Sequence, residues 1–187
     1  MLISMALFMY GAARKKTACK LLCSPEELFS SIKVLLENPS SNGAREKLYS
    51  KVRESTRLFP VVQRIAAHES ITIEDAFILY ALGTHELWHN ELVAKDSDGL
   101  LPAHIVNCFV FPARMNKDFI RVYTSVGPIN TVYDGPSELQ GLFVEPYELA
   151  AVHWGIPFMN ITESECNELK DKNRLLVQNM SSLAREE

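Results

Sequence analysis

The 187-residue chain lacks long apolar runs, closely paired cysteines and an excess of basic residues, each of which would define a class of protein. No stretch approaches the roughly 20 apolar residues that a transmembrane helix needs. The four cysteines form no Cys-x-x-Cys pair, so neither a disulfide framework nor a zinc ribbon is indicated. Buried thiols in a reduced compartment such as the cytoplasm are the simplest interpretation. The formal charge of -4 argues against nucleic-acid binding, because proteins that follow a phosphate backbone are usually basic.

Acidic residues are also missing from the first 25 positions. An apolar stretch at 1–13 is followed by basic residues, which is the reverse of the order in a secretory signal. An acid-free, basic start is similar to a mitochondrial transit peptide. The interpretation that we favour is a buried first helix built on Leu2, Ile3, Leu7 and Phe8. We therefore expect an N-terminal segment at 1–23 and a single domain at 24–187.

Helix signals organise the first half of the chain. Ser24-Pro25-Glu26-Glu27 is a capping box with proline at the first helical position, and it predicts a helix that ends near Asn38-Pro39. A turn at 40–43 precedes a second, more charged helix, which we expect to stop before Pro60. Thr72-Ile73-Glu74-Asp75 is the cap of the next helix.

The helix capped at Thr72 leads into residues 85–89, which carry the most informative motif of the chain. Residues 76–82 are apolar almost all round, so we expect the helix to run through the core. The turn sequence Asp96-Ser97-Asp98-Gly99 predicts its end. This turn also resembles the start of a calcium loop, but it lacks the later acidic ligands.

β-branched and aromatic residues dominate 105–111, 119–126 and 129–133, and turn signals separate these segments. They predict three short antiparallel strands. Residues 146–154 are expected to form a helix, and Thr162 caps a last amphipathic helix whose seam is Leu169, Leu176, Met180 and Leu183. The fold class predicted is α+β, mostly helical with a small antiparallel sheet.

The most informative feature is the sequence His85-Glu86-Leu87-Trp88-His89, which has the pattern His-Glu-x-x-His. Residues i and i+4 of a helix lie one above the other, so both imidazoles can reach one metal ion. Glu86 would lie beside the metal, where it can take a proton from a coordinated water molecule. The pattern therefore predicts a zinc site with His85 and His89 as ligands and Glu86 as general base.

At this point the chain resembles the zincin metallopeptidases. The resemblance implies a small zinc-dependent peptidase that acts on a protein or peptide substrate. In that superfamily a third protein ligand defines the subgroup, and three acids are candidates here. Glu148 or Glu145 would come from a later helix, as in the phage-type regulatory metallopeptidases. Asp96 would correspond to the aspartate of short zincins such as injected bacterial effector proteases.

Geometry ranks these candidates. The expected helix at 146–154 places Glu148 in its first turn, and we favour this residue. In the alignment with the phage-type enzymes, Glu145 takes the ligand position instead. A straight helix would carry Asp96 about 10 Å beyond His89, so the helix would have to break before Asp96 could bind the same metal.

A second class of function stays open, namely a non-catalytic helical interaction module or a subunit of a larger assembly. In that interpretation His85 and His89 are polar positions on a buried helix, each bonded to a backbone carbonyl. The basic N-terminus and the amphipathic last helix would be contact surfaces. His153 and Tyr133 could polarise a substrate carbonyl or hold an oxyanion, although ordinary packing explains both residues more simply.

Overall fold

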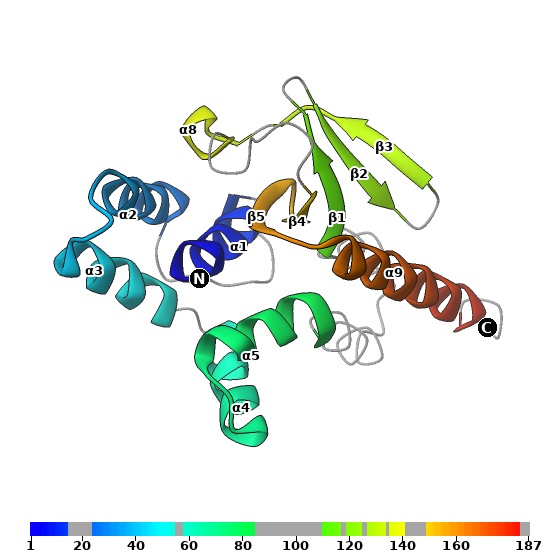
Figure 1. The fold of residues 1–187 in the computed structure, drawn as a ribbon, viewed down its shortest axis with the longest axis horizontal. Helices are drawn as coiled ribbons and strands as arrows, with labels where there is room; N and C mark the ends of the chain where they lie inside the picture. Colours follow the sequence, from blue (N-terminus) through cyan, green and yellow to red (C-terminus); the bar gives the residue numbers. More distant parts are fainter. Residues whose placement is uncertain are drawn as a thin grey trace. The chain divides into compact units, whose positions relative to one another are not determined.

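The computed structural model describes residues 1–14, 24–54, 58–84, 110–116, 119–124, 127–133, 135–140 and 149–183. These residues form two compact units, Met1–Ala81 and Leu82–Glu187. Helices predominate, and one small antiparallel sheet accompanies them (Figure 1). The predicted α+β class is therefore confirmed. None of the described helices is both long enough and apolar enough to cross a membrane.

The first unit consists of helices α1 (Leu2–Arg14), α2 (Pro25–Glu37), α3 (Asn42–Arg53), α4 (Leu58–Glu69) and α5 (Ile73–Leu79). Helices α1, α2 and α3 pack against one another, and α4 packs against α5. The buried first helix is confirmed, because α1 buries Leu7 and Phe8, while Leu2 and Ile3 are half-buried. The Phe8 ring meets the Phe77 ring edge-on, with centroids 5.7 Å apart. This contact joins α1 to α5.

The predicted caps are present. The backbone N–H of Glu27 donates to Ser24 Oγ at 3.2 Å, and the N–H of Ser24 donates to Glu27 Oε2 at 3.1 Å. Helix α2 begins at Pro25 and ends at Glu37, as expected. The second helix stops at Arg53, before Pro60. Pro60 lies in the first turn of α4, a helix that we did not predict. Backbone N–H groups in a first turn have no intrahelical acceptor, so proline costs no hydrogen bond there.

The helix that leads to the motif is less regular than predicted. Thr72 caps it through a hydrogen bond from the Asp75 N–H to Thr72 Oγ1 at 3.1 Å. The α-helical part ends at Leu79, and the chain continues as a π-helical turn, η1 (Tyr80–Thr84). Ala76 and Phe77 of α5 are buried, as is Tyr80 of η1, but the side chain of Leu79 is 41% exposed. The helix therefore packs along one face only, and the prediction of apolar burial all round is wrong at Leu79.

The sheet belongs to the second unit and has the strand order β3-β2-β1-β4-β5, with every neighbouring pair antiparallel. Its strands are β1 (Val110–Met115), β2 (Ile120–Thr124), β3 (Gly127–Thr131), β4 (Leu149–His153) and β5 (Ile156–Asn160). Strands β2 and β3 lie close to their predicted positions. Strand β1 continues beyond Phe111, where we expected it to end, and it includes Pro112. Because β2 pairs only with 113–115, Pro112 lies just outside that ladder, where a residue without an N–H is tolerated.

The predicted helix at 146–154 is wrong for its described part, because Leu149–His153 is strand β4. Trp154 and Gly155 follow with φ angles of 53° and 78°, and two residues with positive φ make the tight turn into β5. The alanines of β4 favour a helix, but all five of its residues are buried between neighbouring strands. Tertiary pairing therefore overrides the local preference.

Helix α9 (Glu163–Leu183) confirms the last predicted helix, and the short α8 (Ser137–Gln140) was not predicted. Thr162 and Glu165 form a second capping box, with bonds of 2.7 Å and 3.2 Å. Leu169 of the predicted seam is buried, whereas the side chains of Leu176, Met180 and Leu183 lie outside the described part of the structure. Helix α9 packs against β1, β2 and β4.

Candidate functional site

The predicted metal ligands and the predicted base all lie outside the described residues. This applies to His85, Glu86 and His89, and also to the three acids proposed as third ligand, Glu148, Glu145 and Asp96. The described chain reaches Thr84, one residue before the motif, and resumes at Val110. The two sides of segment 85–109 can therefore be described, and both are attached to α9.

Lys172 of α9 holds the end of the helix that leads to the motif. Its Nζ donates a hydrogen bond of 2.7 Å to the backbone carbonyl of Leu82, which lies in η1. A cation at the C-terminal turn of a helix stabilises carbonyl groups that face the negative end of the helix dipole. Single π-helical turns are uncommon and occur often at functional sites. The last described residues before the motif are thus helical and anchored.

Asn173, the next residue of α9, holds the start of strand β1. Its Nδ2 donates a hydrogen bond of 3.1 Å to the backbone carbonyl of Val110. The Asn173 side chain is only 1% exposed, and its Oδ1 is buried without a hydrogen-bond partner. A buried acceptor of this kind costs about 1–3 kcal/mol if nothing satisfies it. Asn173 therefore presents an unused oxygen inside the second unit.

His153 lies beside Val110. It is fully buried and stands directly opposite Val110 in the β1–β4 ladder. Arg114 of β1 bonds to Glu163 of α9 at 3.1 Å and stands opposite Leu149. Residues that are opposite one another, or two apart along a strand, share a face of a sheet. His153 is therefore on the face that α9 covers.

Tyr123 of β2 takes part in two further contacts on this face, one within the sheet and one with α9. The hydrogen bond between Arg114 and the Tyr123 hydroxyl raises the pKa of the guanidinium, so Arg114 stays charged beside Glu163. The Nζ of Lys170 lies 4.2 Å from the centre of the Tyr123 ring, a cation–π contact. Helix α9 thus contacts β1 and β2 along its first ten residues before it reaches Lys172 and Asn173.

Tyr133 and Trp154 place polar atoms near the same hairpin. The Tyr133 hydroxyl is buried, and a side chain on Gly135 would collide with it and with Ile156, the register partner of His153. The ring of Trp154 lies 6.4 Å from the ring of His153, and Trp154 Nε1 is buried without a hydrogen-bond partner. Of the two residues singled out from the sequence, His153 pairs with Ile156, and Tyr133 lies with Ile156 beside Gly135.

Sequence reasoning missed Lys172 and Asn173. For Lys172 there is no signal, because lysines are common on exposed helix faces. Asn173 had a signal: it follows Cys166 and Leu169 at helical spacing, and both of these residues are buried. A polar residue within an apolar seam indicates a specific hydrogen bond more often than solvent exposure.

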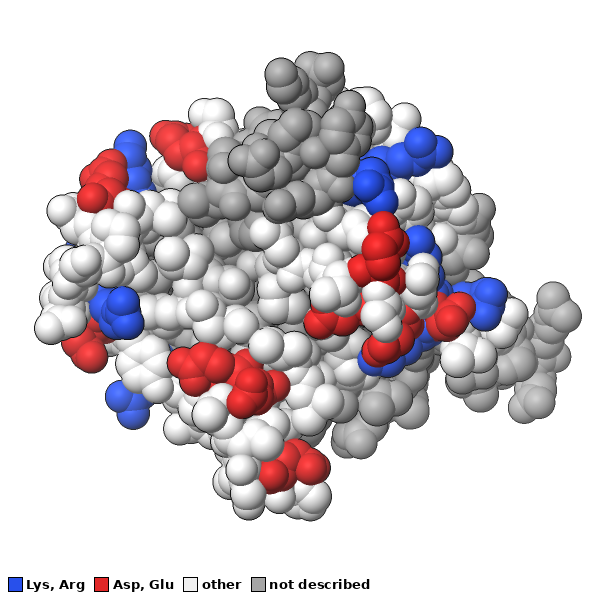
Figure 2. Space-filling view, viewed as in Figure 1, with Lys and Arg blue, Asp and Glu red and all other residues white. Residues whose placement is uncertain are grey.

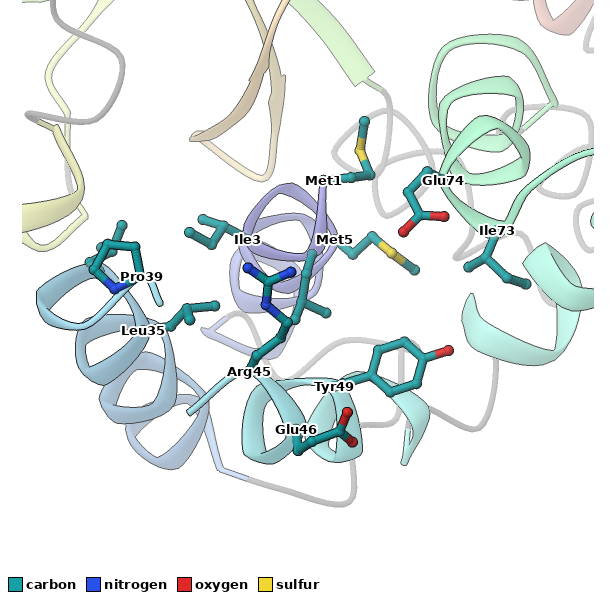
Figure 3. A pocket seen from close by; sticks show the side chains of 12 residues that line it. Met1, Ile3, Met5, Leu35, Pro39, Arg45, Glu46, Tyr49, Ile73 and Glu74 are labelled. Carbon is teal, nitrogen blue, oxygen red and sulfur yellow. The ribbon is translucent and has the colours of Figure 1, made fainter. Parts of the chain in front are cut away.

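The first unit contains a separate pocket of about 520 Å³, lined by residues of α1, α2 and α3 and by the start of α5. Its walls are mostly apolar. Figure 3 shows Arg45 extending from α3 toward α1, with Glu46 and Glu74 also at the rim. Its polar lining, among the described residues, comes from Arg45, Glu46, Tyr49 and Glu74.

The described residues show neither a basic surface stripe in Figure 2 nor a cluster of metal ligands. On the face drawn in Figure 2, acidic and basic side chains are intermingled, and the basic ones form no continuous stripe. Within the described ranges no group of three or more His, Cys, Asp or Glu side chains is arranged to hold a metal. No family model, curated protein or solved structure matches the chain.

Proposed function

We propose that the chain is a small zinc-dependent peptidase in which His85 and His89 hold the metal and Glu86 is the general base. The observation that carries the proposal is the motif itself, which places two imidazoles and one acid at the spacing of a catalytic zinc site. The resemblance to the zincins supports the reaction class.

One feature of the described surroundings supports the metal. The chain approaches His85 as a capped helix over 73–84, and a helix is the element that lets residues i and i+4 reach the same metal ion.

In this mechanism the chain's own residues orient the reactants and move the proton. Zinc, when bound, supplies a Lewis acid that polarises the scissile carbonyl. Glu86 takes a proton from the attacking water molecule and passes it to the departing amine. A third ligand completes the site, for which the sequence favoured Glu148, with Glu145 and Asp96 as alternatives. The helix that favoured Glu148 is not formed over 149–153.

An interaction module remains the second candidate, and one observation favours it. Strand β3 is an edge of the sheet, and Ile129 and Val132 at and beside it are 52% and 75% exposed. An exposed apolar edge strand is a common place for another chain to add a strand. In this function the motif would be part of a buried helix.

The test compares the full-length wild-type protein with Glu86→Gln on a degenerate peptide library, with cleavage followed by mass spectrometry. The amide can still bond to water but cannot accept its proton, so the variant should keep zinc and lose cleavage by 100-fold or more, roughly the contribution of a general base. Glu91→Gln, in the same segment, is the matched control and should cleave normally. Wild-type turnover in Glu86→Gln would rule out Glu86 as the base. A folded, zinc-loaded wild type that cleaves nothing would favour the interaction module.

A further inference from the structure

The pocket of the first unit is large enough for a small molecule. Its volume is about 520 Å³, and sites for small molecules have volumes of roughly 300–1,000 Å³. Helices α1, α2 and α3 pack against one another around it, and the ring contact between Phe8 and Phe77 brings α5 beside α1. Every described residue that lines the pocket belongs to Met1–Ala81, so the pocket is a feature of one compact unit.

Most of the surface inside this pocket is apolar. Met5 of α1 and Leu35 of α2 are only 2% and 5% exposed. Half-buried apolar side chains of α1, α2 and α5 add to the lining, namely Leu2, Ile3, Leu36 and Ile73. Removing such surface from water is favourable by about 25 cal/mol per Å². The pocket therefore favours a ligand whose body is apolar.

Charged side chains of both signs stand at the rim of the pocket. Helix α3 supplies Arg45 and Glu46, and α5 supplies Glu74 (Figure 3). All three residues are exposed. Tyr49 lies on the same face of α3, because it follows Arg45 by four residues and Glu46 by three. A positive group and two negative groups thus surround one apolar volume.

These rim charges have no partner among the residues that the structure describes, either in an ion pair or in a side-chain hydrogen bond. Two basic residues farther along α3 differ in this respect. Lys51 pairs with Glu27 at 3.8 Å, and the Arg53 guanidinium lies 5.3 Å from the centre of the Tyr49 ring. The charges at the pocket are therefore available to a ligand.

The position of Arg45 gives it no stabilising role within its own helix. Helix α3 begins at Asn42, and its first turn contains no acid, although the helix dipole favours negative charge there. Arg45 follows Asn42 by three residues, so its positive charge lies near the positive end of that dipole. A ligand anion accounts for a cation at this position better than the stability of the helix does.

We propose that this pocket binds a short apolar peptide with free ends, such as a tripeptide of leucine. The leucine side chains would fill the apolar volume against Met5 and Leu35. The peptide carboxylate would bond to Arg45, whose guanidinium can donate two parallel hydrogen bonds to it. The peptide ammonium would face Glu46 and Glu74. A ligand that carried only one of these charges would leave the opposite charge of the rim without a partner.

This site goes beyond the proposed peptidase and does not depend on its metal. It is tested by isothermal titration calorimetry of the full-length protein with Leu-Leu-Leu, in the presence of a chelator that prevents metal-dependent cleavage of the probe. The N-acetylated peptide lacks the ammonium, and the C-terminally amidated peptide lacks the carboxylate. Both should bind about fivefold more weakly than the free peptide, because each loses one charged contact. No binding of the free peptide, or a capped form that binds as tightly, would overturn the proposal.

Variants of the rim assign each charge. Arg45→Gln should weaken the binding of free Leu-Leu-Leu by a similar factor and should not weaken the binding of the amidated peptide. Glu46→Gln combined with Glu74→Gln should weaken the free and the amidated peptide but not the acetylated one. Lys47→Gln is the matched control, because Lys47 is exposed on α3 and does not line the pocket. Wild-type affinity for the free peptide in a folded Arg45→Gln variant would overturn the proposal.

Discussion

Val110 and His153 stand directly opposite each other in the β1–β4 ladder, and the same Val110 offers its carbonyl to Asn173 of α9. Val110 thus lies between a buried histidine and a buried asparagine at the start of β1. A buried amide loses its hydration and therefore needs a partner inside the protein, and the Asn173 Nδ2 finds one in the Val110 carbonyl.

Asn173→Leu should destabilise the second unit. The substitution removes the buried hydrogen bond from Asn173 Nδ2 to the Val110 carbonyl, and a buried acceptor that loses its donor costs about 1–3 kcal/mol. Asn167→Leu, at an exposed position of the same helix, is the control. Thermal unfolding followed by circular dichroism measures the difference, and equal midpoints in the two variants would show that the bond to Val110 does not stabilise the fold.

Ser24→Ala should destabilise the first unit by about 1 kcal/mol, because the Glu27 N–H loses its capping oxygen. Urea denaturation followed by circular dichroism measures this difference. Ser30→Ala, at an exposed position within the same helix, should not destabilise. A Ser24→Ala variant as stable as the wild type would contradict the capping role.

The effect of Ser24→Ala should also depend on pH. The pKa of Glu26 is lowered by hydrogen bonds to its carboxylate from the Glu26 backbone N–H and from the Ser24 side chain. A carboxylate whose pKa is lowered by folding stabilises the folded state at neutral pH, and this contribution is lost as the pH falls through the lowered pKa. The stability difference between wild type and Ser24→Ala should therefore narrow in acid. A difference that widens in acid would be the opposite result.

Ser70→Gly should stabilise the first unit by roughly 0.5–1 kcal/mol. Ser70 has a φ of 56° at the end of α4, and the Ile71 N–H bonds back to the Ala66 carbonyl. This is the Schellman arrangement, whose left-handed position favours glycine. The midpoint of thermal unfolding should rise in Ser70→Gly and not in Ser70→Ala. A decrease in Ser70→Gly would mean that the Ser70 side chain makes a contact of its own.

The caps could be predicted from the sequence because their partners are three residues apart. Ser24, Thr72 and Thr162 each bind a nearby N–H, and all three helices start where the pattern indicates. The strand at Leu149–His153 could not be predicted in this way. Its residues favour a helix locally, and what makes them a strand is pairing with β1, about 40 positions earlier.

One part of the candidate site could be predicted from local sequence, and the other part could not. The spacing of His85 and His89 is visible in five residues of sequence, so the metal prediction needed no fold. A third ligand would have to come from a distant segment, and the choice of Glu148 depended on a helix at 146–154 that the chain does not form over 149–153. Sheet register, which placed His153 beside Val110, arises from long-range pairing that local patterns do not encode.

The central claim is that the chain holds zinc through its motif, and elemental analysis tests it most directly. The full-length protein, expressed with ample zinc and then dialysed, should contain about one zinc per chain. His89→Ala should lose most of this metal, and His68→Ala should keep it, because His68 is exposed in the first unit. A wild-type protein that keeps its helical circular dichroism but carries no zinc would contradict the account.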